Sequence, residues 1–221
     1  MVADATFESI APTPELSPVR RYVILAVIIL SVTLYSTSIL IVAAVLPQLQ
    51  GAMSATPDEI SWTMTFNILA TAVMTPLTGW MAARFGRRNL LGGSVAIMAV
   101  ATYFCGAATT LESLIFWRIV QGAAGASLPP IGQSVTLNIF PKHQHGMVIG
   151  MYGVGVVMGA FIGPMIGGVM AELYTWRYAF YMLAPIAVFA SIGVMIALPR
   201  THRTQETKLE WTGFLLLSIS I

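Results

Sequence analysis

Long apolar runs separated by short polar segments dominate this chain. A helix that crosses a bilayer needs about 20 mostly apolar residues, and six stretches are of that kind. The predicted spans are 22–46, 61–83, 90–108, 110–138, 147–171 and 177–199. Another apolar run, 212–221, follows a polar linker at 200–211 and is too short to cross. It is expected to be the truncated start of a seventh span, and the sequence then resembles the front part of a longer protein.

The composition supports a membrane protein of the all-α, polytopic class. Of the 221 residues, 57% are hydrophobic and only 9% are charged, whereas soluble domains carry about 25% charged residues. The deficit extends along the whole chain, so a core wrapped in a polar shell is excluded. Residues 1–19 are polar and proline-containing and are predicted to be a disordered cytoplasmic tail. The single cysteine, Cys105, excludes an intrachain disulfide.

The distribution of basic residues predicts the orientation. Lysine and arginine are enriched in cytoplasmic loops. Only Arg177 falls in the other set of loops, and Arg118 falls inside a span. The N-terminus is therefore expected in the cytoplasm, in a cell membrane (an inner membrane where there are two). The residues before span 1 or in the loops after spans 2, 4 and 6 are Arg20, Arg21, Arg84, Arg87, Arg88, Lys142, Arg200, Arg203 and Lys208.

Two short signatures recur about three helices apart. "VAAVLPQL" (42–49) resembles "AGASLPPI" (124–131), and "TPLTG" (75–79) resembles "GPMIG" (163–167). Three is an odd number, so the second triplet would cross the membrane with opposite polarity. Such inverted repeats are typical of secondary transporters.

Arg118 is the notable charge within the spans. Arg118, Gln121, Gly122 and Gly125 are spaced i, i+3, i+4 and i+7, which places them on one helix face. Small residues mark close helix packing or a cavity, so Arg118 is expected to point into the protein. The alternative is that Arg118 snorkels to the headgroups. Glu112, near the start of 110–138, is the one acidic residue within a predicted span, so no carboxylate deep inside a span could pair with Arg118 or carry a proton.

Glycines dominate the fifth predicted span, "GVGVVMGAFIGPMIGG" (153–168). Gly155, Gly159, Gly163 and Gly167 form a ridge without side chains, while Pro164 removes one helix hydrogen bond. Simple helix–helix packing of the GxxxG kind is one interpretation. A helix that must hinge or slide is the other.

Three segments resemble the signature motifs of the major facilitator superfamily. "GWMAARFGRR" (79–88) matches its loop motif at Gly79, Arg84, Gly86, Arg87 and Arg88. "WRIVQGAAGA" (117–126) carries Arg118, Gln121 and Gly122 in register with the span 4 motif. "GAFIGPMIGG" (159–168), which ends in Gly168, matches the span 5 motif of drug exporters. Segments 175–188 and 208–219 further resemble the fourteen-span drug:proton antiporter family of EmrB/QacA type.

The resemblance implies a six-helix N-terminal bundle of two inverted three-helix repeats, in which spans 1 and 4 line a cavity. Arg118 would influence protonation or substrate charge, with Gln121 and Gly122 beside it. Tyr35, Ser38 and Asn67 are candidates for the cavity lining. The span 5 glycines and Pro164 would slide against a second bundle, and the loop arginines would hold the cytoplasmic side of the closed state.

The sequence also departs from the family pattern. Ala83 stands where the loop motif carries an acid, so the charge relay attributed to that motif is incomplete. In span 1, Ser38 and Ala43 stand in place of the usual Asp and Asn. Both differences weaken proton antiport as a specific claim and leave a transporter assignment intact.

The resemblance predicts a multidrug exporter, not an enzyme, which moves amphipathic organic compounds by alternating access. It implies no cofactor or metal, a proton gradient as energy source, a C-terminal bundle, and a periplasmic adaptor for this subfamily; nucleic acid is not an expected partner. A specific metabolite exporter or permease is the first alternative. The second is a membrane interaction protein without transport, or an inactive truncated fragment.

Overall fold

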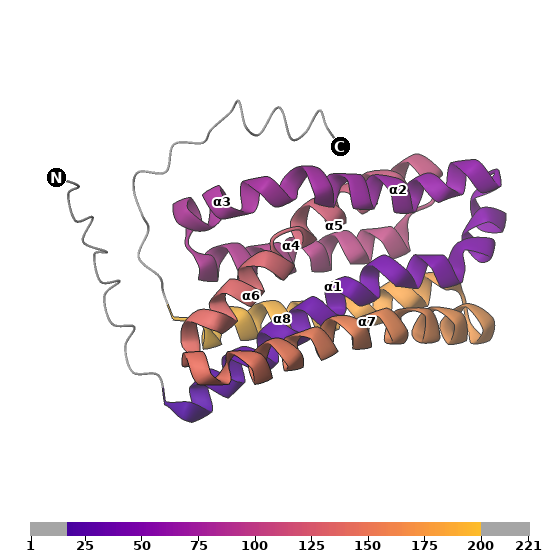
Figure 1. Cartoon of the computed structure of the whole chain (residues 1–221). Helices are drawn as coiled ribbons and strands as arrows, with labels where there is room; N and C mark the ends of the chain where they lie inside the picture. Colours follow the sequence, from indigo (N-terminus) through magenta and orange to yellow (C-terminus); the bar gives the residue numbers. More distant parts are fainter. Residues whose placement is uncertain (1–16, 200–221) are drawn as a thin grey trace.

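The computed structural model describes residues 17–199 as a bundle of helices that run side by side (Figure 1). This part of the chain contains no strand, which confirms the all-α class. The predicted linker 200–211 and the run 212–221 lie outside the described residues. The elements are α1 Pro18–Met53, α2 Pro57–Met74, η1 Thr75–Leu77, α3 Thr78–Phe85, α4 Arg87–Ala107, α5 Leu111–Gly125, α6 Leu128–Ile139, η2 Lys142–Gln144, α7 His145–Leu173 and α8 Trp176–Ala197.

The first helix starts earlier than predicted. Ser17 caps it by accepting a hydrogen bond from the backbone N–H of Arg20 at 3.4 Å, and Pro18 occupies the first turn. Proline suits that position because the first N–H groups of a helix have no intrahelical acceptor. The boundary of the tail at residue 19 is therefore wrong. Residues 1–16 of that tail lie outside the described residues.

Among residues 17–199, five helices are long and apolar enough to cross a membrane, counting α2 to α3 as one. The predicted span 110–138 is the exception, because it is split into α5 and α6 at Ala126 and Ser127. Pro129 and Pro130 have no N–H groups, so two consecutive helix hydrogen bonds are missing. Pro47 stands alone inside α1 and leaves that helix continuous. The predicted fourth span therefore consists of two helices in the structure.

The interfaces between helices follow the proposed repeat. The most extensive contacts join α1 to α7, α4 to α8, and α2 to α5, followed by α4 with α5 and α1 with α8. Exchanging the two triplets converts the α1–α7 pair into α5–α2 and the α1–α8 pair into α5–α4, while α4–α8 maps onto itself. Two three-helix units of related packing therefore build the bundle.

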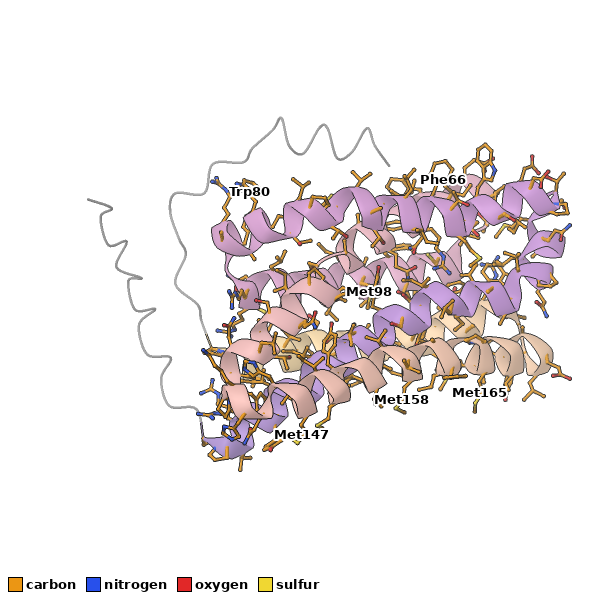
Figure 2. The ribbon with its side chains drawn as sticks, in the orientation of Figure 1. Phe66, Trp80, Met98, Met147, Met158 and Met165 are labelled. Atoms are coloured by element: carbon orange, nitrogen blue, oxygen red, sulfur yellow. The ribbon has the colours of Figure 1, made fainter. Side chains whose placement is uncertain are left out.

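Basic and acidic residues occupy opposite ends of the bundle. Nitrogen-rich side chains gather at the end where α1 and α4 begin (Figure 2). At that end, which we call the basic end, Arg20 Nε donates to the Ala197 carbonyl at 3.4 Å and Arg88 Nη2 donates to the Met195 carbonyl. Both arginines thus satisfy carbonyls in the last turn of α8. The four acids among residues 17–199, Asp58, Glu59, Glu112 and Glu172, all lie at the other end.

Candidate functional site

Arg118 lies in the core of the bundle and is 1% exposed. Its Nη1 donates to the Ser38 carbonyl of α1 and to Gln121 Oε1, both at 2.8 Å. Its Cζ lies 5.1 Å from the centroid of the Phe180 ring of α8, within the range of a cation–π contact. The guanidinium therefore ties α5 to α1 and α8, and the snorkelling alternative is wrong.

Gln121 extends this contact to α4. Its Nε2 donates to Thr102 Oγ1 at 2.6 Å, and that hydroxyl donates onward to the Met98 carbonyl at 2.7 Å. Burial strengthens such a chain of hydrogen bonds, because no water competes for its members. We call Arg118, Gln121, Thr102 and Phe180 the arginine cluster. Side chains from three helices thus surround one fixed charge.

The arginine cluster contains unused hydrogen-bonding capacity. Arg118 Nε and Nη2 are buried and have no hydrogen-bond partner within residues 17–199. None of the acids in this part of the chain lies in the middle of a helix. An intramembrane charge without a countercharge is costly and usually serves function. The cluster can therefore attract a negative group.

The face of α5 that carries Arg118 also packs tightly against α2. Asn67 Nδ2 donates to the Arg118 carbonyl at 2.8 Å, and Thr71 Oγ1 lies 3.1 Å from the Gly122 carbonyl. A Cβ at Gly122 would lie 2.2 Å from the Asn67 carbonyl oxygen. Gly122 is thus needed for the close approach of the two helices, as the spacing of small residues indicated.

The three candidate cavity residues have buried side chains, of which Tyr35 and Asn67 hydrogen-bond to neighbouring helices. Tyr35 OH donates to Thr71 Oγ1 at 3.2 Å, and Ser38 Oγ donates to the Tyr35 carbonyl at 2.8 Å. Tyr35, Ser38 and Asn67 are all buried. All three are covered by neighbouring residues in the described bundle, and their place in a transport cavity stays a prediction.

The glycine ridge of α7 faces α1 in the same bundle. A Cβ at Gly159 would lie 2.4 Å from the Thr33 carbonyl oxygen, and one at Gly163 would lie 2.9 Å from the Thr37 carbonyl oxygen. Thr33 Oγ1 donates to the Gly155 carbonyl at 2.8 Å, and Thr37 Oγ1 donates to the Gly159 carbonyl at 3.2 Å. The expected sliding contact of these glycines with a second bundle is thus replaced by a contact with α1.

Pro164 and Gly168 differ from the glycine ridge in position. Pro164 is exposed on the outer side of α7, and no atom lies within 4 Å of a Cβ built at Gly168. Gly167, in contrast, packs against Ile41 of α1. The motif therefore divides into an inward face of glycines and an outward face that other parts of the protein can reach.

The loop motif forms the turn between α3 and α4. Gly86 has φ 82° and ψ 144°, and its N–H donates to the Ala82 carbonyl at 3.0 Å. Only glycine adopts this backbone region without strain. Arg84 lies over the Trp80 ring at 5.7 Å, Arg88 contacts α8, and Gly79 has open space around it. The turn thus positions three arginines, Arg84, Arg87 and Arg88, at the basic end.

Comparison with known proteins identifies the family. The family model of the Major Facilitator Superfamily matches residues 26–219, which is most of the chain. The chain belongs to the major facilitator superfamily. Most of the helical bundle, the arginine cluster and the α3–α4 turn lie within the matched residues.

Similar curated proteins include a multidrug export protein and putative multidrug resistance proteins. Over 177 residues the chain is 30% identical to the multidrug export protein EmrB of Escherichia coli K12, which covers 80% of this chain and 35% of the relative. It is 29% identical over 178 residues to the putative multidrug resistance protein MdtD of Klebsiella pneumoniae, which covers 80% of this chain and 38% of that relative. These names agree with the predicted resemblance to drug exporters. The chain spans little more than a third of the length of these relatives.

A solved transporter structure has a similar fold. The bacterial homologue of the human lysosomal transporter Spinster, in its inward-facing and unoccupied conformation, matches with a TM-score of 0.72 and 19% identity. The match covers 89% of this chain and 47% of that protein. The chain is thus a multi-pass membrane protein of superfamily architecture.

Two members of the arginine cluster were not predicted. Thr102 is a hydroxyl residue within an apolar span, and that polarity was a signal that could have suggested a buried partner. Phe180 carries no such signal, because one more phenylalanine in an apolar helix is unremarkable. Only the packing of α8 against α5 places its ring beside the guanidinium.

Proposed function

We propose that the full-length protein is a secondary active exporter of several amphipathic organic compounds and that it works by alternating access. The superfamily match over residues 26–219 carries this proposal. The multidrug exporters among the relatives support the substrate class. The described bundle would rock as one unit against a second bundle in the remainder of the protein.

We propose that Arg118 links this movement to protonation. Its positive charge, held in a low-dielectric interior, stabilises a nearby carboxylate and favours loss of its proton. The two buried nitrogens without partners are the groups that such a carboxylate would contact. Residues outside 17–199, or an acidic substrate, would supply the negative group. A proton gradient would then drive export without a cofactor.

The remaining motifs would stabilise the states of the transport cycle in which the cytoplasmic side or the outward path is closed. Arg84 and Arg87 at the α3–α4 turn would hold the closed cytoplasmic side through acids or helix C-termini elsewhere. Arg88 already uses one N–H group on α8. The exposed side of α7 at Pro164 and Gly168, rather than its glycine ridge, would meet the second bundle and help to seal the outward path.

The protein would reside in the cytoplasmic membrane with the basic end in the cytoplasm. That orientation follows from the enrichment of lysine and arginine in cytoplasmic loops. A periplasmic adaptor is a partner that the subfamily resemblance suggests. The lipid bilayer and the second bundle are the other proposed partners.

A transport experiment tests the proposal. Cells that lack their main drug exporters would express the full-length protein and be tested with several unrelated amphipathic compounds. Raised resistance to at least two classes is expected, and uptake into inverted vesicles should require an imposed pH gradient.

The alternatives give different results. Export of one compound alone would replace multidrug efflux with a specific metabolite exporter. Correct membrane insertion with no transport of any compound would favour a membrane interaction protein. Transport that continues without a pH gradient would contradict proton coupling and leave export standing.

A further inference from the structure

An apolar groove runs between α1 and α7 on the outside of the bundle. Its volume is about 530 Å³, and both helices contribute its walls. Ala26 and Leu30 of α1 stand on one side, and Val154 and Met158 of α7 on the other. Met158 lies on the outward side of α7, as Figure 2 shows. The groove is therefore open to whatever surrounds the bundle.

The length of the groove matches one leaflet of a membrane. It extends from Tyr22, close to the start of α1, to Thr33. At 1.5 Å per helical residue this distance is about 16 Å, roughly half of the 30 Å hydrocarbon core of a bilayer. The groove thus begins at the basic end and ends near the middle of the bundle.

The inner end and the floor of the groove offer no free polar group. The Thr33 hydroxyl, at the inner end, already donates to the Gly155 carbonyl. The floor includes Leu25, which packs in a buried cluster with Phe140 and Val148. An occupant would therefore gain apolar contact along this length and no hydrogen bond. The methionine side chains that line the groove can adapt to a flexible apolar ligand.

The mouth of the groove is aromatic and lies at the basic end of the bundle. The Tyr22 ring, whose centroid lies 5.5 Å from that of Phe140, stands edge-on against it. Arg21 precedes Tyr22, and its buried Nε has no partner within residues 17–199. Lys142 is exposed two residues after Phe140. The acids in the described part of the chain lie at the opposite end, so this mouth favours a negative headgroup.

We propose that the α1–α7 groove binds one acyl chain of an anionic phospholipid from the cytoplasmic leaflet. The chain lies along the groove, and the phosphate lies against Arg21 and Lys142 at the mouth. The depth of one leaflet, the apolar walls and the mouth at the basic end fit this occupant. The inference concerns lipid binding and does not depend on the transported substrate.

Native mass spectrometry of the delipidated full-length protein tests the proposal with phosphatidylglycerol and phosphatidylcholine of equal chain length. One phosphatidylglycerol should bind more tightly than phosphatidylcholine. Lys142→Gln should weaken that binding about fivefold, the contribution of one basic residue near an anionic headgroup, while Lys142→Arg should preserve it. Equal binding of the two lipids to the unmodified protein would overturn the proposal.

Filling the groove provides the second arm. Ala26→Phe should abolish the tight phosphatidylglycerol site, and Ala43→Phe should preserve it, because Ala43 is exposed on the same helix outside the groove. If Ala26→Phe does not fold, Val154→Phe replaces it, with Val188→Phe on α8 as its control. Val154 and Val188 are both exposed and are equally far, in residues, from the basic ends of their helices. Unchanged binding in a folded groove variant would show that the groove is not the lipid site.

Discussion

At the scale of single residues, Arg118 shows how a charge can be kept inside a membrane protein. Its guanidinium uses the Ser38 carbonyl, the Gln121 amide and the Phe180 ring instead of a carboxylate. These neutral partners hold the side chain in place and leave its full charge uncompensated. That combination suits a residue whose effect is electrostatic.

Substitution of Arg118 separates charge from hydrogen bonding. Arg118→Ala should insert and abolish export, because it removes the charge and leaves buried partners unsatisfied at about 1–3 kcal/mol each. Arg118→Gln can retain hydrogen bonds without the charge and should also lose at least tenfold in initial transport rate. The rate in proteoliposomes, normalised to folded protein, is the measurement. Export at the original rate by either variant would assign Arg118 a purely structural role.

A second prediction at this scale concerns Gly86. Its φ of 82° lies where other residues are strained, so Gly86→Ala should reduce stability by about 1–3 kcal/mol. Gly79→Ala is the control, since Gly79 is helical with open space around it, and alanine there should stabilise by up to about 1 kcal/mol. Thermal unfolding in detergent measures both, and an equal effect of the two changes would refute the assignment.

At the scale of elements, polar side chains of one helix bind carbonyls of its neighbour at glycine-bearing faces. Thr33 and Thr37 of α1 donate to the carbonyls of Gly155 and Gly159 in α7. Asn67 and Thr71 of α2 contact the carbonyls of Arg118 and Gly122 in α5. In each pair of helices, the two polar side chains are four residues apart and so are the two carbonyls. The two halves of the bundle therefore pack closely through the same arrangement of contacts.

The glycine ridge can be tested by adding one methyl group. Gly159→Ala places a Cβ 2.4 Å from the Thr33 carbonyl oxygen, and such overpacking costs about 1–3 kcal/mol. Gly153→Ala on the same helix meets no atom within 4 Å and should not destabilise the bundle. Thermal unfolding and the yield of monodisperse protein compare the pair. Equal stability of the two variants would mean that the α1–α7 contact accommodates a methyl group at Gly159 without cost.

At the scale of the whole molecule, the basic and acidic residues of the described bundle lie at opposite ends, which predicts how it is oriented in the membrane. The basic end carries Arg20, Arg88 and Lys142, and the opposite end carries the described acids. Arg177, the exception, is held at the acidic end because Nη1 donates to the Gly106 and Ala108 carbonyls, both at 2.7 Å. One arginine used as a helix cap does not alter the overall asymmetry.

Labelling of single cysteines checks this orientation. In a cysteine-free background, Cys at Gln144 should react with a membrane-impermeant maleimide only after the membrane is permeabilised. Cys at Asp58 should react in intact cells, or in spheroplasts where an outer membrane is present, because it lies at the opposite end. The reverse pattern would place the N-terminus outside and contradict the proposed direction of export.

The class of the protein could be predicted from the sequence, because the physics involved is local. Length and hydropathy of each run predicted the spans, lysine and arginine predicted an asymmetric charge distribution, and the spacing of Arg118, Gln121 and Gly122 predicted a shared buried face. All three residues are buried on α5. The sequence motifs also predicted the superfamily, which the family match confirmed.

Which helix surfaces meet follows from the packing of the whole bundle and could not be predicted from the sequence. The glycines at 155–167 lie against α1 and not a second bundle, and Phe180 completes the arginine cluster. The break at Ala126 and Ser127 follows from two adjacent prolines whose local effect could be foreseen but was not. Small residues indicate that another helix packs closely, but they do not indicate which helix it is. That choice depends on how all the helices fill space together, which no single segment of the sequence encodes.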